Sequence, residues 1–118
     1  MVLRKKVLVV DDDAAFRDGL TLALKTRGFE VASAGTVAGA VAEAEDFSPD
    51  AVLCDWQLSD EDGDGVSVVR HFSDSADVTI IMFTARELSE LKQHCDDVPV
   101  KAFLRKPVSL AAIFELLD

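Results

Sequence analysis

The chain has 118 residues, the size of one ordinary domain, and 49% of them are hydrophobic, which argues against disorder. Its formal charge is −10, from 12 Lys and Arg against 22 Asp and Glu; a surface of that sign repels phosphate backbones, so we expect no direct binding to nucleic acid. No apolar run approaches the ~20 residues that cross a bilayer or forms a signal peptide, so we expect one cytoplasmic domain over residues 1–118 without membrane contact.

Short apolar runs alternate with helical patterns from residue 7 onward. The first run, Val7–Val10, is continuous and mostly β-branched, which is typical of a strand covered on both faces. A helix is predicted next, because Phe16, Leu20 and Leu24 recur at helical spacing before Gly28, a natural C-cap. A second strand and a second helix are predicted in residues 29–34 and 36–48, with Thr36 as the helix cap.

The remaining three strand–helix pairs follow the same order. Ala51–Cys54 is an apolar strand that leads to Asp55, and a short helix around Val66 and Val69 follows an acidic loop. The run Val78–Phe83 is the most strand-like segment of the chain. The last elements are a helix around residues 88–91, a short strand at 102–104 and a helix from 110 that Ser109 can cap.

This order of elements predicts an α/β fold built from five βα units. Right-handed crossovers between parallel strands produce an open sheet with helices on both faces. Ligands bind such sheets outside the carboxyl ends of the strands. The residues directly after each strand are therefore the candidate functional site.

Charged and polar side chains follow four of the five predicted strands. Asp11 and Asp12 follow the first strand, Asp55 the third, Thr84 the fourth and Lys106 the fifth. Carboxylates brought together repel one another unless a cation lies among them, and oxygen ligands without His or Cys suit Mg²⁺. A metal-neutralised carboxylate beside a lysine and a hydroxyl has the parts that phosphoryl transfer requires, so the pattern predicts a phosphoryl acceptor at Asp55.

The ordered set of motifs resembles the receiver domain of two-component response regulators, in the CheY-like superfamily. The matching pieces are VLVVDDD at residues 7–13, Asp55, Thr84–Ala85 and Lys106–Pro107. Each piece is common alone, but in this order they are specific, and they span essentially the whole chain. The resemblance implies a doubly wound five-stranded parallel sheet with the flavodoxin-like strand order 2-1-3-4-5.

The resemblance also implies a metal and an acceptor. Asp55 would be the phosphorylated residue. Asp11, Asp12 and Asp55 would form an acidic pocket for Mg²⁺, together with the backbone carbonyl of Gln57. Mn²⁺ would be a substitute for Mg²⁺.

A second group of residues would bind the phosphoryl group and transmit its presence. By the resemblance, Thr84, Ala85 and Lys106 would contact the phosphoryl group, and Phe103 would be the aromatic switch residue. The peptide bond before Pro107 is commonly cis in the family, whereas only ~5% of X–Pro bonds are cis in folded proteins.

The implied partners are a sensor histidine kinase or a histidine phosphotransfer protein, either of which would present phosphohistidine. Phosphorylation would draw Thr84 and Lys106 inward and change the face formed by residues 86–117. That face would signal to a partner or to an output domain, and it is also a candidate surface for a homodimer. The chain would be a signalling phosphoacceptor and not an enzyme with a separate substrate.

The chain departs from the family pattern at three places. Ser59 stands where the family often has Pro, and Asp64–Gly65 matches the helix start better than Asp62–Gly63, which predicts a longer loop. Phe103 occupies the switch position without a phenolic hydroxyl, and the chain has no tyrosine. The signalling surface would therefore lack one polar contact.

Three alternatives compete with the receiver interpretation. Asp60, Asp62 and Asp64 resemble the opening of a calcium loop, but position 12 of that loop is His71 and not Glu. A phosphatase of the haloacid-dehalogenase type also uses an aspartate after a strand, but it has a second Asp where this chain has Gln57. The third alternative is a pseudo-receiver that binds partners without being phosphorylated.

Overall fold

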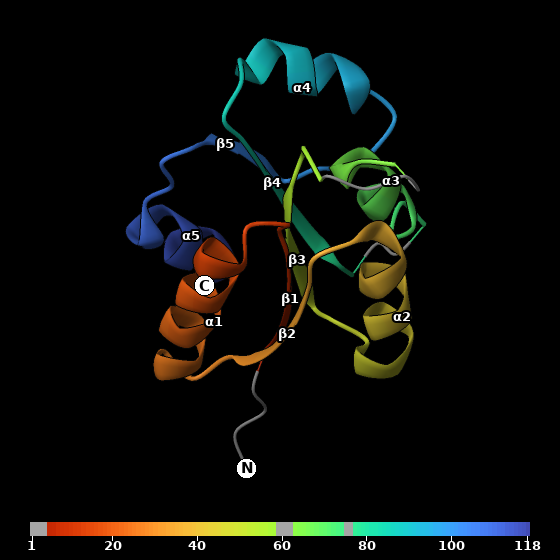
Figure 1. The fold of residues 1–118 in the computed structure, drawn as a ribbon. Helices are drawn as coiled ribbons and strands as arrows, with labels where there is room; N and C mark the ends of the chain where they lie inside the picture. Colours follow the sequence, from red (N-terminus) through yellow and green to blue (C-terminus); the bar gives the residue numbers. More distant parts are fainter. Residues whose placement is uncertain (1–4, 59–62, 75–76) are drawn as a thin grey trace.

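A parallel sheet lies at the centre of the computed structural model, which describes residues 5–58, 63–74 and 77–118 (Figure 1). The described strands are β1 (Lys6–Val10), β2 (Glu30–Ala34), β3 (Ala51–Asp55), β4 (Thr79–Thr84) and β5 (Ala102–Arg105). Their spatial order is β2-β1-β3-β4-β5, which confirms the predicted flavodoxin-like order. Every neighbouring pair is parallel, as expected for strands joined by helical crossovers.

Helices cover both faces of the sheet. They are α1 (Ala14–Thr26), α2 (Val37–Phe47), α3 (Gly65–Arg70), α4 (Leu88–His94) and α5 (Leu110–Leu117). Helices α1 and α5 pack on one face, whereas α2 and α3 pack on the other (Figure 1). Helix α4 joins the second layer through Leu91, which is fully buried. No helix in the described ranges is long and apolar enough to cross a membrane.

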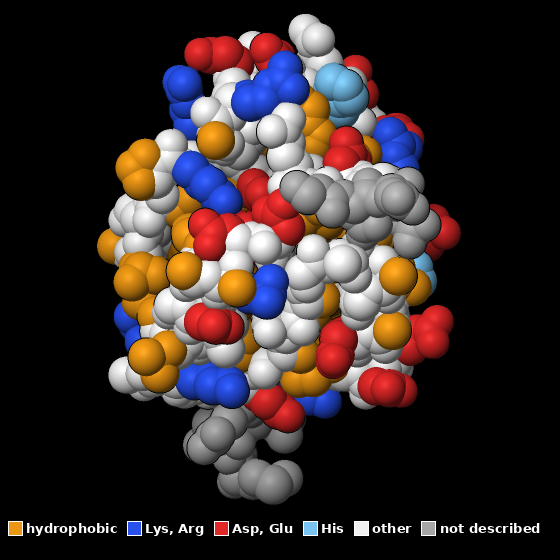
Figure 2. Space-filling model, in the orientation of Figure 1, with side chains coloured by type: hydrophobic (Ala, Val, Ile, Leu, Met, Phe, Trp, Pro, Cys, Tyr) orange, Lys and Arg blue, Asp and Glu red, His pale blue; other side chains and the backbone are white. Residues whose placement is uncertain are grey.

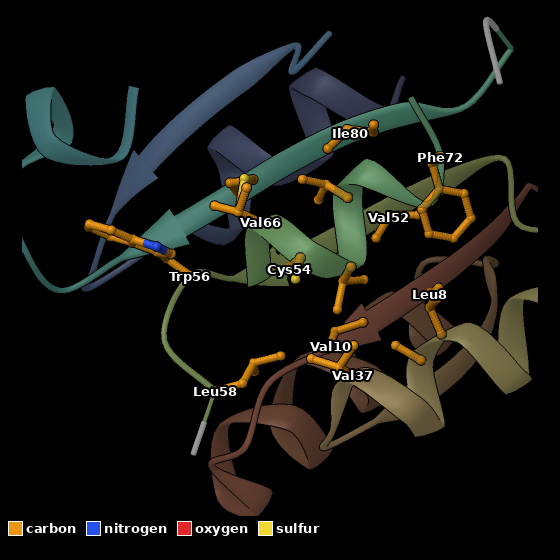
Figure 3. Packing of buried hydrophobic residues seen from close by; sticks show 14 of the residues in the cluster. Leu8, Val10, Val37, Val52, Cys54, Trp56, Leu58, Val66, Phe72 and Ile80 are labelled. Atoms are coloured by element: carbon orange, nitrogen blue, oxygen red, sulfur yellow. The ribbon is translucent and has the colours of Figure 1, made fainter. Parts of the chain in front are cut away.

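The core is divided by the sheet into two clusters. Alternate side chains of a strand point to opposite faces, so Val7 and Val9 pack toward α1 and α5. Leu8 and Val10 pack toward α2 and α3 (Figure 3). All four are fully buried, and each such side chain stabilises the fold by roughly 1.5–3 kcal/mol relative to an exposed position.

Side-chain caps start four of the five described helices, and the sequence predicted two of these caps, Thr36 and Ser109. Asp13 accepts hydrogen bonds from the backbone N–H groups at the start of α1, Thr36 caps α2 and Ser109 caps α5. Asp64 caps α3, which confirms that this helix begins at the Asp64–Gly65 pair. The C-cap of α1 is Arg27, one position before the predicted Gly28, which follows it with φ 102°.

Several element boundaries differ from the prediction by one residue. Strand β4 begins at Thr79 and includes Thr84, and β5 extends to Arg105. Thr84 pairs with Arg105 in the parallel ladder, so backbone pairing with a neighbour extends both strands beyond their apolar runs. Cys54 and Cys95 are both buried and form no disulfide.

Candidate functional site

The carboxyl edge of the sheet brings together the side chains that the sequence placed after separate strands. Asp11 and Asp12 follow β1, Asp55 ends β3, Thr84 ends β4 and Lys106 follows β5. Asp11 and Asp55 lie at the central strands, which are adjacent in the sheet. Since all the strands are parallel, their carboxyl ends meet at one edge.

At this edge, Lys106 from the C-terminal part of the chain contacts Asp11 from the N-terminal part. Its Nζ donates a hydrogen bond of 2.8 Å to Oδ2 of Asp11 and lies 3.5 Å from Oδ1 of Asp55. It also lies 4.3 Å from the centroid of the Phe16 ring, within the range of a cation–π contact. Burial would lower the pKa of Lys106, but the hydrogen bond to Asp11 and the charge of Asp55 outweigh it, so the pKa is raised.

Three carboxylates form a cluster beside Lys106. Among the described residues, Asp11, Asp12 and Asp55 each offer an oxygen such that these atoms lie within 4.8 Å of one another. Asp11 and Asp55 are buried and Asp12 is exposed, so the cluster opens to solvent on one side. An oxygen-only set of this size fits Mg²⁺, which takes few protein ligands and retains several waters.

Asp55 has a weakened preference for its charged form. Burial raises its pKa from the usual 3.8 to about 6, Lys106 opposes this rise, and the charges of Asp11 and Asp12 add to it. A cation bound among the three carboxylates would offset the charges of Asp11 and Asp12, so these two neighbours would no longer raise the pKa of Asp55. The electrostatics of the site therefore favour a bound cation at neutral pH.

The Thr84 hydroxyl is buried and is already hydrogen-bonded. It accepts a bond of 2.9 Å from the backbone N–H of Arg86. Ala85, between them, is exposed. Phe103 on β5 is half-buried and packs against the hydrophobic cluster that includes Leu91 of α4. The ammonium of Lys92 lies 6.0 Å from the centroid of the Phe103 ring.

Two backbone features complete the set of predicted positions. Gln57 is exposed in the loop that follows β3, two residues after Asp55. The peptide bond between Lys106 and Pro107 is cis, the form that the family resemblance implied.

Trp56 is a member of the site whose structural role the sequence did not predict. It is 4% exposed, and its indole Nε1 donates a hydrogen bond of 3.1 Å to Oδ2 of Asp64 (Figure 3). The guanidinium of Arg86 lies 5.2 Å from its ring centroid, and the ring of His94 lies 5.1 Å away. The only sequence signal was its position next to Asp55. His94 on α4 is exposed, and its ring makes this contact.

A hollow of about 420 Å³ opens beside Trp56. Its lining includes Gln57, Asp64 and Arg86. The hollow lies beside the loop that follows β3, which begins directly after Asp55. Its residues come from the β3–α3 and β4–α4 connections, which only the folded chain brings together.

Gly65 is required by the close approach of two backbone segments. A β-carbon at this position would lie 2.0 Å from the carbonyl oxygen of Asp55. The Gly65 N–H donates to the carbonyl of Trp56, so the start of α3 is held against the end of β3. The sequence indicated Gly65 only as a helix start.

The calcium-loop alternative rests partly on residues outside the described ranges. Ser59, Asp60 and Asp62 belong to the segment 59–62, which the structure does not describe. Asp64 is described, and both of its carboxylate oxygens accept hydrogen bonds: Oδ1 from the first N–H groups of α3 and Oδ2 from Trp56. These bonds favour a structural role for Asp64.

Comparison with known proteins identifies the family. The model of the response regulator receiver domain matches residues 7–118. The chain is 34% identical over 115 residues to the DNA-binding response regulator MtrA of Mycobacterium tuberculosis strain H37Rv, covering 93% of this chain and 49% of that protein. It is 28% identical over 110 residues to the phosphate regulon transcriptional regulatory protein PhoB of Escherichia coli K12, covering 91% and 47%. The chain thus spans about half the length of these relatives.

Solved structures show the same fold. A CheY-like receiver domain protein from Methanospirillum hungatei JF-1 superposes with a TM-score of 0.87 at 26% identity, covering 98% of this chain and 91% of that one. A response regulator protein from Burkholderia pseudomallei, solved with a phosphorylated aspartic acid, a calcium ion and citrate, has a TM-score of 0.84 at 25% identity, covering 97% and 66%.

Proposed function

Because the chain belongs to the response regulator receiver domain family, we propose that Asp55 accepts a phosphoryl group from phosphohistidine on a sensor histidine kinase or a histidine phosphotransfer protein. The observation that carries this proposal is the position of Lys106 Nζ, 3.5 Å from Oδ1 of Asp55 and next to a cluster of three carboxylates. The similar response regulator protein from Burkholderia pseudomallei was solved with a phosphorylated aspartic acid and a calcium ion, which supports the same chemistry here.

The transfer is a displacement at phosphorus. A carboxylate oxygen of Asp55 forms a bond to the phosphorus while the phosphorus–nitrogen bond to the partner histidine breaks, and the imidazole leaves. Lys106 would contact an oxygen of the transferred group from its place beside Asp55, loosening its present bond to Asp11. Thr84 would hydrogen-bond a second oxygen, and the backbone at Ala85 a third. These contacts would position the transferred group and neutralise its charge, which is most of what phosphoryl transfer requires.

Mg²⁺ is the proposed cofactor, with Mn²⁺ as a substitute. Asp11, Asp12, Asp55 and the backbone carbonyl of Gln57 would hold it, since they supply oxygen ligands only. When bound, the ion would offset negative charge on the carboxylates and on the phosphoryl oxygens. Lys106 supplies the remaining positive charge from the chain itself.

Phosphorylation would act as a switch. The added charge of about −1.5 to −2 attracts Lys106 and gives the Thr84 hydroxyl a stronger acceptor than any neutral group. Moving an equilibrium from 1:99 to 99:1 requires about 5.5 kcal/mol of differential stabilisation. Part of this would come from Lys106 and Thr84, and part from repacking of the half-buried Phe103.

The face formed by residues 86–117 would transmit the signal. The MtrA relative is named as a DNA-binding regulator, and this chain covers only about half of it, so a partner or an output domain would receive the signal. The chain's charge of −10 opposes direct nucleic-acid binding by these 118 residues.

The chain would catalyse only its own phosphorylation and slow dephosphorylation. Gln57 occupies the position where phosphatases of the haloacid-dehalogenase type have a second aspartate as acid and base. An amide side chain does not transfer protons in this way. Turnover of separate phosphoesters is therefore not expected.

Phosphodonor labelling tests this proposal. Purified protein incubated with phosphoramidate and Mg²⁺ should gain the mass of one phosphoryl group, and Asp55→Asn should gain none. Asp46→Asn, an exposed acid on α2, is the matched control and should be labelled like the unaltered chain. Full labelling of Asp55→Asn would place the acceptor elsewhere, whereas absence of labelling in the unaltered chain, from either phosphoramidate or a phosphorylated kinase, would favour a pseudo-receiver.

A further inference from the structure

Arg17 holds the short connection between β1 and α1, which presents two of the three clustered carboxylates. It lies near the start of α1, and its partly buried guanidinium donates a hydrogen bond of 2.7 Å from Nη1 to the backbone carbonyl of Asp11. Its own backbone N–H donates a bond of 2.9 Å to the carbonyl of Asp13. Arg17 therefore bonds to the residues on both sides of Asp12.

Asp11 is held both through its side chain and through its backbone. Its carboxylate accepts bonds of 2.9 Å from the Asp13 N–H at Oδ1 and of 2.8 Å from Lys106 at Oδ2. These are the bonds that an arriving ion or phosphoryl group would alter. The backbone N–H of Asp11 donates to the carbonyl of Ala34 at 3.1 Å, and its carbonyl accepts from Arg17. Because the backbone bonds do not use the carboxylate, they persist when its partners change and keep the residue in place.

Gly35 leaves the space through which Arg17 reaches Asp11. It stands between the end of β2 at Ala34 and the α2 cap Thr36. A β-carbon on Gly35 would lie 2.8 Å from Nη1 and 3.5 Å from Cζ of Arg17, and 3.7 Å from the carbonyl oxygen of Asp11. Any larger residue at this position would push the guanidinium away from that oxygen. The β2–α2 connection thus takes part in holding the β1–α1 connection.

Arg17 brings positive charge close to the acidic cluster without forming an ion pair with it. Figure 2 shows acidic side chains gathered at the centre of the view, over the carboxyl ends of the strands. None of the ion pairs formed among the described residues includes Arg17. Its charge alone would repel a metal ion, whereas its hold on a ligand residue would strengthen metal binding. The two effects have opposite signs, so an experiment can separate them.

We propose that Arg17 is a positioning residue for the divalent ion: it fixes the backbone of Asp11, through the space left by Gly35, and so holds the carboxylates of Asp11 and Asp12 toward that of Asp55. The oxygens of these three carboxylates lie within 4.8 Å of one another, an arrangement that like charges oppose and a fixed backbone maintains. Ligands held in place bind more tightly, because less order is imposed on binding. The inference rests on the proposed Mg²⁺ site.

Binding of Mn²⁺ to the unphosphorylated chain, followed by the electron paramagnetic resonance signal of the free ion, tests the proposal. Arg17→Met removes the donor and the charge and should raise the dissociation constant about tenfold or more, as expected when a residue that orients a ligand is lost. Arg17→Lys retains a cationic donor and should recover part of this loss. Arg27→Met, at the other end of α1, is the matched control and should bind like the unaltered chain. Equal or tighter binding by Arg17→Met would overturn the proposal.

Gly35→Ala alters the same contact without changing Arg17. The added β-carbon displaces the end of a flexible side chain, so the fold should be retained while Nη1 leaves the Asp11 carbonyl. The dissociation constant should rise to about the level of Arg17→Met, and the double variant should show no further rise, since one contact is removed only once. Gly19→Ala, whose β-carbon meets open space, is the control. Additive losses in the double variant would contradict the role assigned to Gly35.

Amide hydrogen exchange in EDTA distinguishes failure of this inference from failure of the proposed metal site. Arg17→Met should speed exchange of the Asp11 and Asp13 amides, which donate bonds within and beside the connection, by a larger factor than that of Ile81 in β4. If the unaltered chain binds no Mn²⁺, the metal site itself is wrong, and exchange alone decides whether Arg17 holds the connection. Loss of stability in urea with unchanged exchange and Mn²⁺ affinity would leave Arg17 a structural role only and refute the proposal.

Discussion

The backbone N–H of Arg86 donates a hydrogen bond of 2.9 Å to the hydroxyl oxygen of Thr84, while the guanidinium of Arg86 lies 5.2 Å from the ring centroid of Trp56. Arg86 also pairs with Glu90 of α4 at 2.6 Å. Movement of the Thr84 hydroxyl toward a phosphoryl group on Asp55 would therefore disturb Arg86, and with it both Trp56 and α4. Such a movement would give the chain a route from the site to α4 that does not need a tyrosine at position 103.

Trp56 fluorescence is expected to report this movement. With Mg²⁺ already saturating, addition of beryllofluoride should change the emission, because Arg86 shifts away from the indole ring as Thr84 is recruited. Arg86→Gln should lose most of this second change while still binding the analogue. Arg105→Gln, an exposed arginine paired with Glu87, is the control and should respond like the unaltered chain. An undiminished response in Arg86→Gln would contradict the proposed route.

The stability of the metal-free protein is expected to depend on pH through Asp55. Its folded-state pKa of about 6 lies above the usual 3.8, so the folded state binds the proton more tightly than the unfolded state. This group therefore stabilises the fold as pH falls from about 6 toward 3.8 and contributes a penalty above pH 6. Asp55→Asn should raise the free energy of unfolding at pH 7 by about 1–3 kcal/mol, measured by urea denaturation in EDTA.

Magnesium should reduce this difference between Asp55→Asn and the unaltered chain. Binding to the folded state stabilises the chain that retains the acceptor carboxylate more than the variant that lacks it. Asp46→Asn again serves as the control and should show no gain at pH 7. Equal stability of Asp55→Asn and the unaltered chain in EDTA would show that Asp55 is not under strain in the metal-free state.

Lys106 is expected to hold down the pKa of Asp55. Its ammonium is the charge that opposes the effect of burial, so Lys106→Met should move the Asp55 pKa above about 6 in the metal-free protein. Carbon-13 NMR titration of the Asp55 carboxyl measures this directly. Lys92→Met removes an equal charge near Phe103 and should leave the titration unchanged. A fall in the Asp55 pKa on loss of Lys106 would be inconsistent with the ion pair.

Gly65 and Gly19 offer a matched pair for stability. Gly65→Ala places a β-carbon 2.0 Å from the Asp55 carbonyl oxygen, so it should destabilise the fold by at least about 2 kcal/mol. Gly19→Ala meets open space inside a helix and should stabilise the fold by roughly 0.5–1 kcal/mol. Thermal unfolding of dilute protein measures both. A neutral Gly65→Ala would mean that α3 can move away from β3 without cost.

Local patterns along the chain were sufficient to predict the succession of strands and helices, whereas the spatial order of the strands was implied by the family resemblance. The alternation of apolar runs and helical periodicity predicted the five βα units, and Thr36 and Ser109 cap the helices that they were predicted to cap. These features succeed because capping and amphipathic burial involve neighbours within a few residues. The ends of the fourth and fifth strands lie one residue beyond the predicted positions, at Thr84 and Arg105. Pairing between these two strands, and not the local sequence, decides where they end.

The contacts within the site could not be predicted in the same way. Trp56 gave no sequence signal beyond its position, although it contacts Asp64 of its own connection, Arg86 of the β4–α4 connection and His94 of α4. The close approach of Gly65 to Asp55 is also invisible in the sequence. Each depends on how separate connections are stacked at the edge of the sheet.

The amino-acid sequence by itself determined the order of the strands and helices and the chemical type of the side chain at each strand end. Only the tertiary structure decided the distances between them, as between Lys106 and Asp11, which are 95 residues apart in the chain and 2.8 Å apart in space. It also decided that Leu22 of α1 and Leu110 of α5 stay exposed. The physical reason is that propensity and periodicity act over one or two turns of chain, whereas a site is set by long-range packing, whose geometry no local pattern encodes.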